Sequence, residues 1–206
     1  MTSPSVSVLV RALNEAQHLQ KLVDSLRSQT RVPDQLVLVD SGSTDGTSEL
    51  ARSLGFDVVH IKKEEFSFGR SLNLGISKCS GELIVNLSAH VYPVEDTFLA
   101  ELLSVFENPN IGFAYTRQQG NCDSAFSELM IMRNWYPPGE THVVSNFPFA
   151  NNASSAFRKD VWKSLKFNEM LPGLEDVDFC RSSVRRGYEV AYVPNVSIIH
   201  IHNESW

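Results

Sequence analysis

Two adjacent carboxylic acids, Glu175 and Asp176, stand at the start of a segment whose apolar residues recur at helical spacing. The apolar positions are Val177, Cys180 and Val184. Acidic side chains in the first turn of a helix interact favourably with its dipole, so the pair can simply stabilise the helix. The dipole lowers the pKa of a carboxylate, and a second acid beside it opposes that shift. An ionised carboxylate can also take a proton from a hydroxyl group, which is the task of a general base.

Polar residues gather at three points where short apolar runs end, namely Arg11–Glu15, Asp40–Asp45 and Ser88–His90. In open parallel sheets, ligands bind beyond the carboxyl ends of the strands. Asp40 can accept a hydrogen bond from the imide N–H of a uracil or a similar base. The alternative is that Asp40 closes an Asx turn or caps a helix, and Asp45 is the more natural cap of the two.

Arg70 opens a predicted helix, which is an electrostatically poor position for a cation. A bound anion such as a diphosphate would explain the arginine, and an exposed salt bridge is the alternative. The sequence has no glycine-rich phosphate loop of the GxGxxG or GxxxxGKS/T type. Dinucleotide-dependent dehydrogenases and P-loop enzymes are therefore poor fits.

Strand and helix patterns alternate along the first half of the chain. Short β-branched or apolar runs predict strands over residues 6–10, 35–40, 57–61, 82–87 and 111–115. Amphipathic spacing predicts helices at 19–26, 47–54, 70–78 and 98–106, and later at 159–166 and 175–186 before a last strand at 189–193. This alternation predicts an α/β fold in which a mostly parallel central sheet is flanked by helices.

Residues 116–155 break the alternation, since they combine one candidate helix near 124–135 with several prolines and the pair Asn151-Asn152. We expect this stretch to form a loop-rich insertion over the sheet.

The composition describes a globular protein of ordinary size. The 206 residues are 42% apolar. The chain contains 18 Lys and Arg and 24 Asp and Glu, which gives a net charge of −6. The acidic balance argues against a nucleic-acid binder, which usually carries a basic stripe. Three cysteines without a CxxC pattern are typical of reduced thiols, and no apolar run approaches the ~20 residues of a membrane span. We expect a cytoplasmic protein, for which docking to the inner face of a membrane stays open.

Six stretches, in this order, resemble the family 2 glycosyltransferases of the GT-A fold. They are Val8–Glu15, Val39–Thr47, Phe68–Gly75, Leu87–Pro93, Leu174–Phe179 and Pro194–Asn203. The resemblance covers almost the whole chain and implies one Rossmann-like GT-A domain over residues 1–206. About 1–115 would bind the nucleotide sugar and about 116–206 the acceptor. The chain stops four residues after His202, whereas relatives often continue into further helices, so a C-terminal truncation is one interpretation.

The resemblance also implies roles for single residues. Asp176 would be the catalytic base of an inverting transferase, with Glu175 holding the acceptor. The residues expected at the donor nucleotide are Arg11, Asn14, Glu15, Asp40, Ser41, Asp45 and Arg70. For Glu15, a favourable contact with the helix dipole is an equal alternative to a ribose hydroxyl.

Ser88-Ala89-His90 stands where the family usually carries Asp-x-Asp, the clamp for a divalent cation. Histidine in the third position resembles the Asp-x-His variant, and His200 and His202 follow the last predicted strand, where the family often supplies another ligand. Imidazole ligands favour Mn²⁺ over Mg²⁺. Because both acids are missing, a plain hydrogen-bonded His90 and a metal-independent protein are alternatives.

The expected function is inverting transfer of a sugar from a nucleoside-diphosphate sugar to a hydroxyl of a glycan or a lipid-linked saccharide. One alternative is a catalytically inactive nucleotide-sugar-binding module, which the lost Asp-x-Asp suggests. Another is an enzyme that transfers nucleotides to sugar phosphates. That enzyme would need a glycine-rich loop after the first strand, and Arg11–Glu15 contains no glycine.

Overall fold

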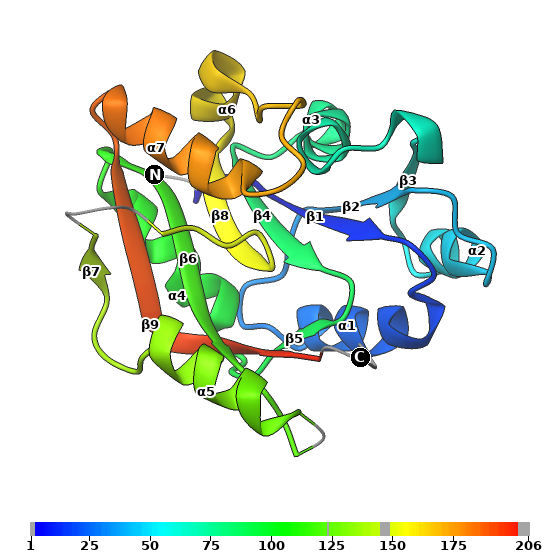
Figure 1. The fold of residues 1–206 in the computed structure, drawn as a ribbon, viewed down its shortest axis with the longest axis horizontal. Coiled ribbons are helices and arrows are strands. Elements are labelled where there is room, and N and C mark those ends of the chain that lie inside the picture. Colours follow the sequence, from blue (N-terminus) through cyan, green and yellow to red (C-terminus); the bar gives the residue numbers. More distant parts are fainter. Residues whose placement is uncertain (1–2, 123, 145–148, 202–206) are drawn as a thin grey trace.

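The computed structural model describes residues 3–122, 124–144 and 149–201. One mixed sheet runs through the molecule and carries helices on both faces (Figure 1). The first half forms β1 (Val6–Ala12), α1 (Ala16–Arg27), β2 (Gln35–Asp40), α2 (Thr47–Ser53), β3 (Asp57–His60), the short helix η1 (Lys63–Glu65), α3 (Phe68–Lys78) and β4 (Leu83–Ser88). Then follow β5 (Val91–Pro93), α4 (Phe98–Ser104), η2 (Val105–Glu107), β6 (Ile111–Gln119), α5 (Phe126–Trp135), β7 (His142–Val143), β8 (Ser154–Arg158), α6 (Lys159–Leu165), α7 (Glu175–Arg185) and β9 (Glu189–His200).

The strand order is β3-β2-β1-β4-β8-β6-β9-β5, and β7 also pairs with β9. Strands β3, β2, β1 and β4 are parallel neighbours, as are β6 and β9. Strand β8 is antiparallel to both of its neighbours, and β5 and β7 are antiparallel to β9. The prediction of a single α/β domain with a mostly parallel sheet is confirmed.

Strand β8 corrects the predicted insertion. The sequence predicts a loop-rich segment up to residue 155, but Ser154–Arg158 form a central strand between β4 and β6. The sequence of this strand shows no run of large apolar residues, because the positions buried between the neighbouring strands include the small residues Ser154, Ser155 and Ala156. The Ser154 hydroxyl lies 2.5 Å from that of Thr116, so its polar atom is satisfied inside the sheet.

Strands β6 and β9 are longer than predicted, and they pair beyond residues 115 and 193. Pro194 interrupts the strand pattern in the sequence, yet a shift of register between Thr116 and Arg117 lets the two strands continue past it. His200 consequently lies inside β9 rather than after the last strand.

Each face of the sheet has its own apolar core. Val8 and Val10 of β1 pack with the buried residues of α1, which are Leu19, Leu22, Val23 and Leu26 at the predicted spacing. Leu9 points to the opposite face and packs with residues of α3, α6 and α7. The alternation follows from the strand period of two. No helix in the described residues is both long and apolar enough to span a bilayer.

Candidate active site

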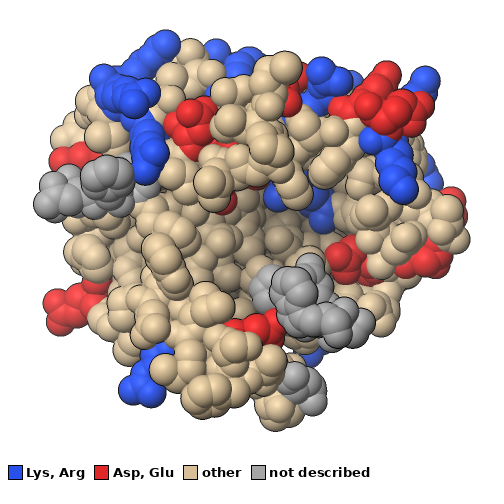
Figure 2. Space-filling view, in the orientation of Figure 1, with Lys and Arg blue, Asp and Glu red and all other residues tan. Residues whose placement is uncertain are grey.

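A cleft of about 310 Å³ lies where β1 and β4 end. Arg11 of β1 stands beside Ser88 of β4, and Ala12 stands beside Asp40 of β2, so the three predicted polar clusters meet at one edge of the sheet. The lining residues are Arg11, Phe68, Ser88, Asn151, Asn152, Ala153, Gly173, Leu174, Glu175 and Asp176. Figure 2 shows a hollow near the middle of this face, with basic atoms visible inside it.

The acidic pair enters the cleft at the start of α7. Leu174, just before it, has a φ of 61°, and this left-handed conformation turns the chain sharply into the helix. The Glu175 carboxylate is buried and lies 3.7 Å from the Arg11 guanidinium. One oxygen of Asp176 accepts the Asn152 N–H at 3.1 Å, and the other accepts the Val177 N–H at 2.8 Å.

Burial raises the pKa of Asp176 above its ordinary value, and the charge of Glu175 adds to the effect. Hydrogen bonds from the backbone of Val177 and Asn152, and the charge of Arg11, oppose the rise without cancelling it. A carboxylate with a raised pKa holds a proton more strongly than an exposed one. The environment therefore makes the Asp176 carboxylate a stronger proton acceptor than the helix dipole alone would allow.

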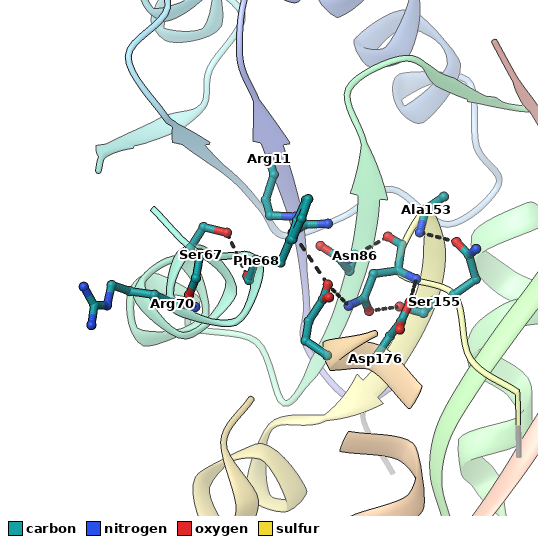
Figure 3. A network of polar contacts seen from close by, with 12 residues as sticks. Arg11, Ser67, Phe68, Arg70, Asn86, Ala153, Ser155 and Asp176 are labelled. Atoms are coloured by element: carbon teal, nitrogen blue, oxygen red, sulfur yellow. Dashed lines mark hydrogen bonds and ion pairs between the residues drawn. The ribbon is translucent and has the colours of Figure 1, made fainter. Parts of the chain in front are cut away.

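Asn152 connects the two acids to the sheet through a network of polar contacts that includes Asn86, Ser155 and Asp176, which are labelled in Figure 3. It is buried, and its side-chain amide donates to Glu175 while its backbone N–H donates to Asp176. Its side-chain oxygen accepts the Ser155 hydroxyl, and its backbone carbonyl accepts the Asn86 amide at 2.6 Å. Sequence reasoning missed both asparagines. The available signal was Asn86, a polar residue inside the apolar strand 83–87.

Arg11 lines the cleft, and its guanidinium stacks on the Phe68 ring at 5.0 Å from the ring centroid. Burial lowers the pKa of Arg11, and the charges of Glu175 and Asp176 partly restore it. Arginine stays protonated even so. The structure therefore places this predicted donor-binding residue directly beside the acidic pair.

Asp40 is buried at the end of β2 and accepts the Ser43 N–H at 3.2 and 3.3 Å. His60 lies 3.3 Å from the same carboxylate. Burial acts to raise the pKa of Asp40, but hydrogen bonds from Ser43, Ser48 and His60 outweigh it, so the pKa is lowered. Beside it, the Ser41 hydroxyl donates to the Ala12 carbonyl at 3.0 Å.

Asp45 is exposed and uses both carboxylate oxygens within the two loops. One accepts the N–H of Ala16, the first residue of α1, at 3.1 Å, and the other accepts the N–H and hydroxyl of Thr47, the first residue of α2. These contacts correspond to the capping interpretation. Asn14 ties the same loops together, since it accepts the Thr44 N–H and donates its own N–H to Ser43.

Arg70 pairs with Glu169 at 3.0 Å and also donates to the Glu65 carbonyl. In Figure 3 its side chain points away from Arg11 and Asp176. The geometry corresponds to the salt-bridge alternative, and a role of Arg70 at the donor stays a prediction.

Three imidazoles form a cluster beside Glu15. His90 Nδ1 lies 2.8 Å from the Glu15 carboxylate, and the His90 ring stacks on that of His200 at 5.1 Å. His18 lies edge-on to His90 and 2.5 Å from the Tyr92 hydroxyl. His200 Nδ1 lies 2.8 Å from the amide oxygen of Gln118. His202 lies outside the described residues.

Comparison with known proteins decides the family. A profile described as "Glycosyl transferase family 2" matches residues 7–166. The chain belongs to this family. An O-antigen chain rhamnosyltransferase of Salmonella typhimurium is 26% identical over 96% of this chain, and the glycosyltransferase AglE of Haloferax volcanii is 36% identical over 97%. This chain spans 67% of the length of each of these relatives.

Solved structures agree on the fold. A mannosyltransferase from Pyrobaculum calidifontis, in complex with GDP-Man and Mn²⁺, superposes with a TM-score of 0.77 at 20% identity. The match covers 100% of this chain and 59% of that one. A glucosyl-3-phosphoglycerate synthase from Mycobacterium tuberculosis gives 0.72 at 20% identity over 98% of this family 2 chain. These neighbours establish a glycosyltransferase GT-A fold.

Proposed function

We propose that this chain moves a sugar from a nucleoside-diphosphate sugar to a hydroxyl acceptor in one displacement, with inversion at the anomeric carbon. The observation that carries the proposal is the position of Asp176. Its carboxylate lines a cleft at the strand ends, its pKa is raised by burial, and Asn152 and Val177 hold both of its oxygens.

In the proposed reaction the acceptor oxygen attacks the anomeric carbon while its proton passes to Asp176, and the nucleoside diphosphate leaves. Glu175, held by Arg11 and Asn152, orients the acceptor. The donor base lies toward Asp40, which accepts an N–H, and the diphosphate lies toward Arg11. A preorganised guanidinium stabilises the charge that develops on the leaving group.

We further propose a divalent cation, Mn²⁺ in preference to Mg²⁺, because the mannosyltransferase and the synthase are in complex with Mn²⁺ in their structures. The candidate ligands are His90, His200 and His202. Within the ranges that the structure describes, no group of three His, Cys, Asp or Glu side chains, the imidazole cluster included, has an arrangement that could hold one metal ion. The described donors do not complete a site, so we assign no catalytic step to the ion. A thermal-shift screen of nucleoside diphosphates with and without Mn²⁺ tests the requirement.

The acceptor is proposed to be a saccharide or a lipid-linked saccharide. One relative is named as an O-antigen chain rhamnosyltransferase and another as a succinoglycan biosynthesis protein. Both names refer to the synthesis of a polysaccharide. We therefore propose that the transferase works in the cytoplasm, peripherally at the inner face of the membrane.

The deciding experiment compares consumption of UDP-, dTDP- and GDP-sugars by the wild type, Asp176→Asn and the matched variant Asp178→Asn. Loss of general-base catalysis lowers rates by ~10²–10⁴. We expect that loss for Asp176→Asn with donor affinity unchanged, and near-normal transfer for Asp178→Asn. An inactive binding module, which Ser88-Ala89-His90 favours because both acids are missing, would bind nucleotide and consume none in any variant.

A further inference from the structure

Helix α5 exposes its apolar side chains to solvent. Of its ten residues only Met132 is buried, while Phe126 is 78% and Ile131 57% exposed. Leu129, Met130 and Trp135 are exposed as well. In Figure 1, α5 lies at the periphery beside β6 and β9. Several large apolar side chains exposed on one short helix typically mark an interaction site.

A pocket of about 290 Å³ lies between α5 and the end of β6. Arg117, which is half-buried, and the exposed Arg133 both line it, together with the apolar Leu129 and Met132. Neither guanidinium forms a hydrogen bond or ion pair with another residue in the described ranges, and no described acidic residue lines the pocket. Two unpaired arginines beside an apolar helix, in a chain of net charge −6, indicate a local anion site.

We propose that α5 and this pocket form a docking surface for an anionic phospholipid bilayer. Phe126, Met130 and Ile131 enter the boundary of the acyl chains, and Arg117 and Arg133 bind headgroup phosphates. A bilayer surface offers an apolar layer and a phosphate layer side by side, which matches this arrangement. An apolar face of a second protein would instead leave both arginines buried without a counter-charge.

The surface is connected to the cleft. Tyr136, directly after α5, is buried and hydrogen-bonds to Asn151, which lines the cleft with Asp176. Docking through α5 therefore brings the acidic pair near the membrane, where a lipid-linked acceptor would lie. This consequence rests on the proposed function, whereas the docking itself does not.

Vesicle flotation tests the docking surface. We expect the full chain to float with vesicles of phosphatidylcholine mixed with phosphatidylglycerol, to bind pure phosphatidylcholine vesicles much less, and to be released by salt. Arg133→Gln should weaken partitioning about fivefold, the effect of one basic residue near an anionic surface. Ile131→Ser should weaken it about tenfold or more. Val32→Ser is the matched control, since Val32 is also 57% exposed but lies outside α5.

Several outcomes would overturn the assignment. They are absence of flotation, equal binding to both vesicle types, or equal loss in Ile131→Ser and Val32→Ser. Release by inorganic phosphate, but not by chloride at the same ionic strength, would make the pocket a site for free phosphate. Self-association that Ile131→Ser abolishes, without vesicle binding, would make a second copy the occupant. Calorimetry with UDP and GDP separates this result from the proposed function, since α5 variants should retain nucleotide binding.

Discussion

Asp176 can accept a proton only when its carboxylate is ionised, so the transfer rate should fall as the pH falls through its pKa. Burial and the charge of Glu175 raise that pKa. We therefore predict an acidic limb in the pH–rate profile above the ordinary aspartate value of about 3.9. Glu175→Gln removes the neighbouring charge and should move the limb to lower pH. A limb that stays in place or moves upward would contradict this coupling.

Asp40 provides a test of the donor end at the same scale. Its carboxylate is buried at the carboxyl end of β2, beside the end of β1 that carries Arg11. We therefore expect Asp40 to accept a hydrogen bond from an N–H of the base. Asp40→Ala should weaken nucleoside diphosphate binding by roughly 1–3 kcal/mol, the usual loss for a hydrogen bond to a charged group. Calorimetry with UDP and dTDP measures the change. The control is Asp57→Ala, because Asp57 lies at the end of β3 away from Asp40. Unchanged affinity in Asp40→Ala would remove Asp40 from the site.

At the scale of elements, Asp45 joins the starts of α1 and α2 through its two oxygens. We predict that Asp45→Ala lowers the free energy of unfolding by ~0.5–2 kcal/mol, the range for losing a helix cap. Nucleotide affinity should change little, in contrast to Asp40→Ala. Urea denaturation and calorimetry on the same variant distinguish the two roles. A stable variant that binds nucleotide poorly would return Asp45 to the donor site.

The packing of α3 on the sheet depends on Gly75. A Cβ at this position would lie 2.5 Å from Leu9 Cδ1 and 2.6 Å from Val39 Cγ2. Alanine favours a helix over glycine by about 1 kcal/mol, but overpacking costs ~1–3 kcal/mol, so Gly75→Ala should destabilise the protein. Gly139→Ala is the matched control, because its Cβ would meet no atom closer than 3.9 Å. Thermal unfolding of both variants measures the difference.

At the scale of the whole molecule, β8 joins the two halves of the chain. It lies between β4 of the first half and β6 of the second, and it begins two residues after Asn152. The same asparagine holds Glu175 and Asp176 at the start of α7. The cleft therefore depends on the whole sheet, because the predicted donor-binding residues Arg11 and Asp40 lie on β1 and β2 and the acidic pair is held through β8. The predicted division into a donor half and an acceptor half stays a prediction.

Much of the fold could be predicted because its signals are local. The spacing of Leu19, Leu22 and Leu26 defines the buried face of α1, and the apolar runs of β1, β2 and β4 define parallel strands. The polar clusters after these strands could be assigned to one edge, because parallel strands end together. The central strand β8 could not be predicted, since its buried serines and alanine carry no strand period.

The sequence by itself determined which residues can bind a ligand or transfer a proton, and which helices and strands carry them. Only the tertiary structure decided their partners. Glu169 pairs with Arg70 from 99 residues away, and His90 reaches Glu15 across 75. Spacing along the chain cannot specify such pairs, because they form only when separate elements pack together and bury their side chains. The same packing supplies the burial that raises the pKa of Asp176, whereas the helix start alone predicts the opposite shift.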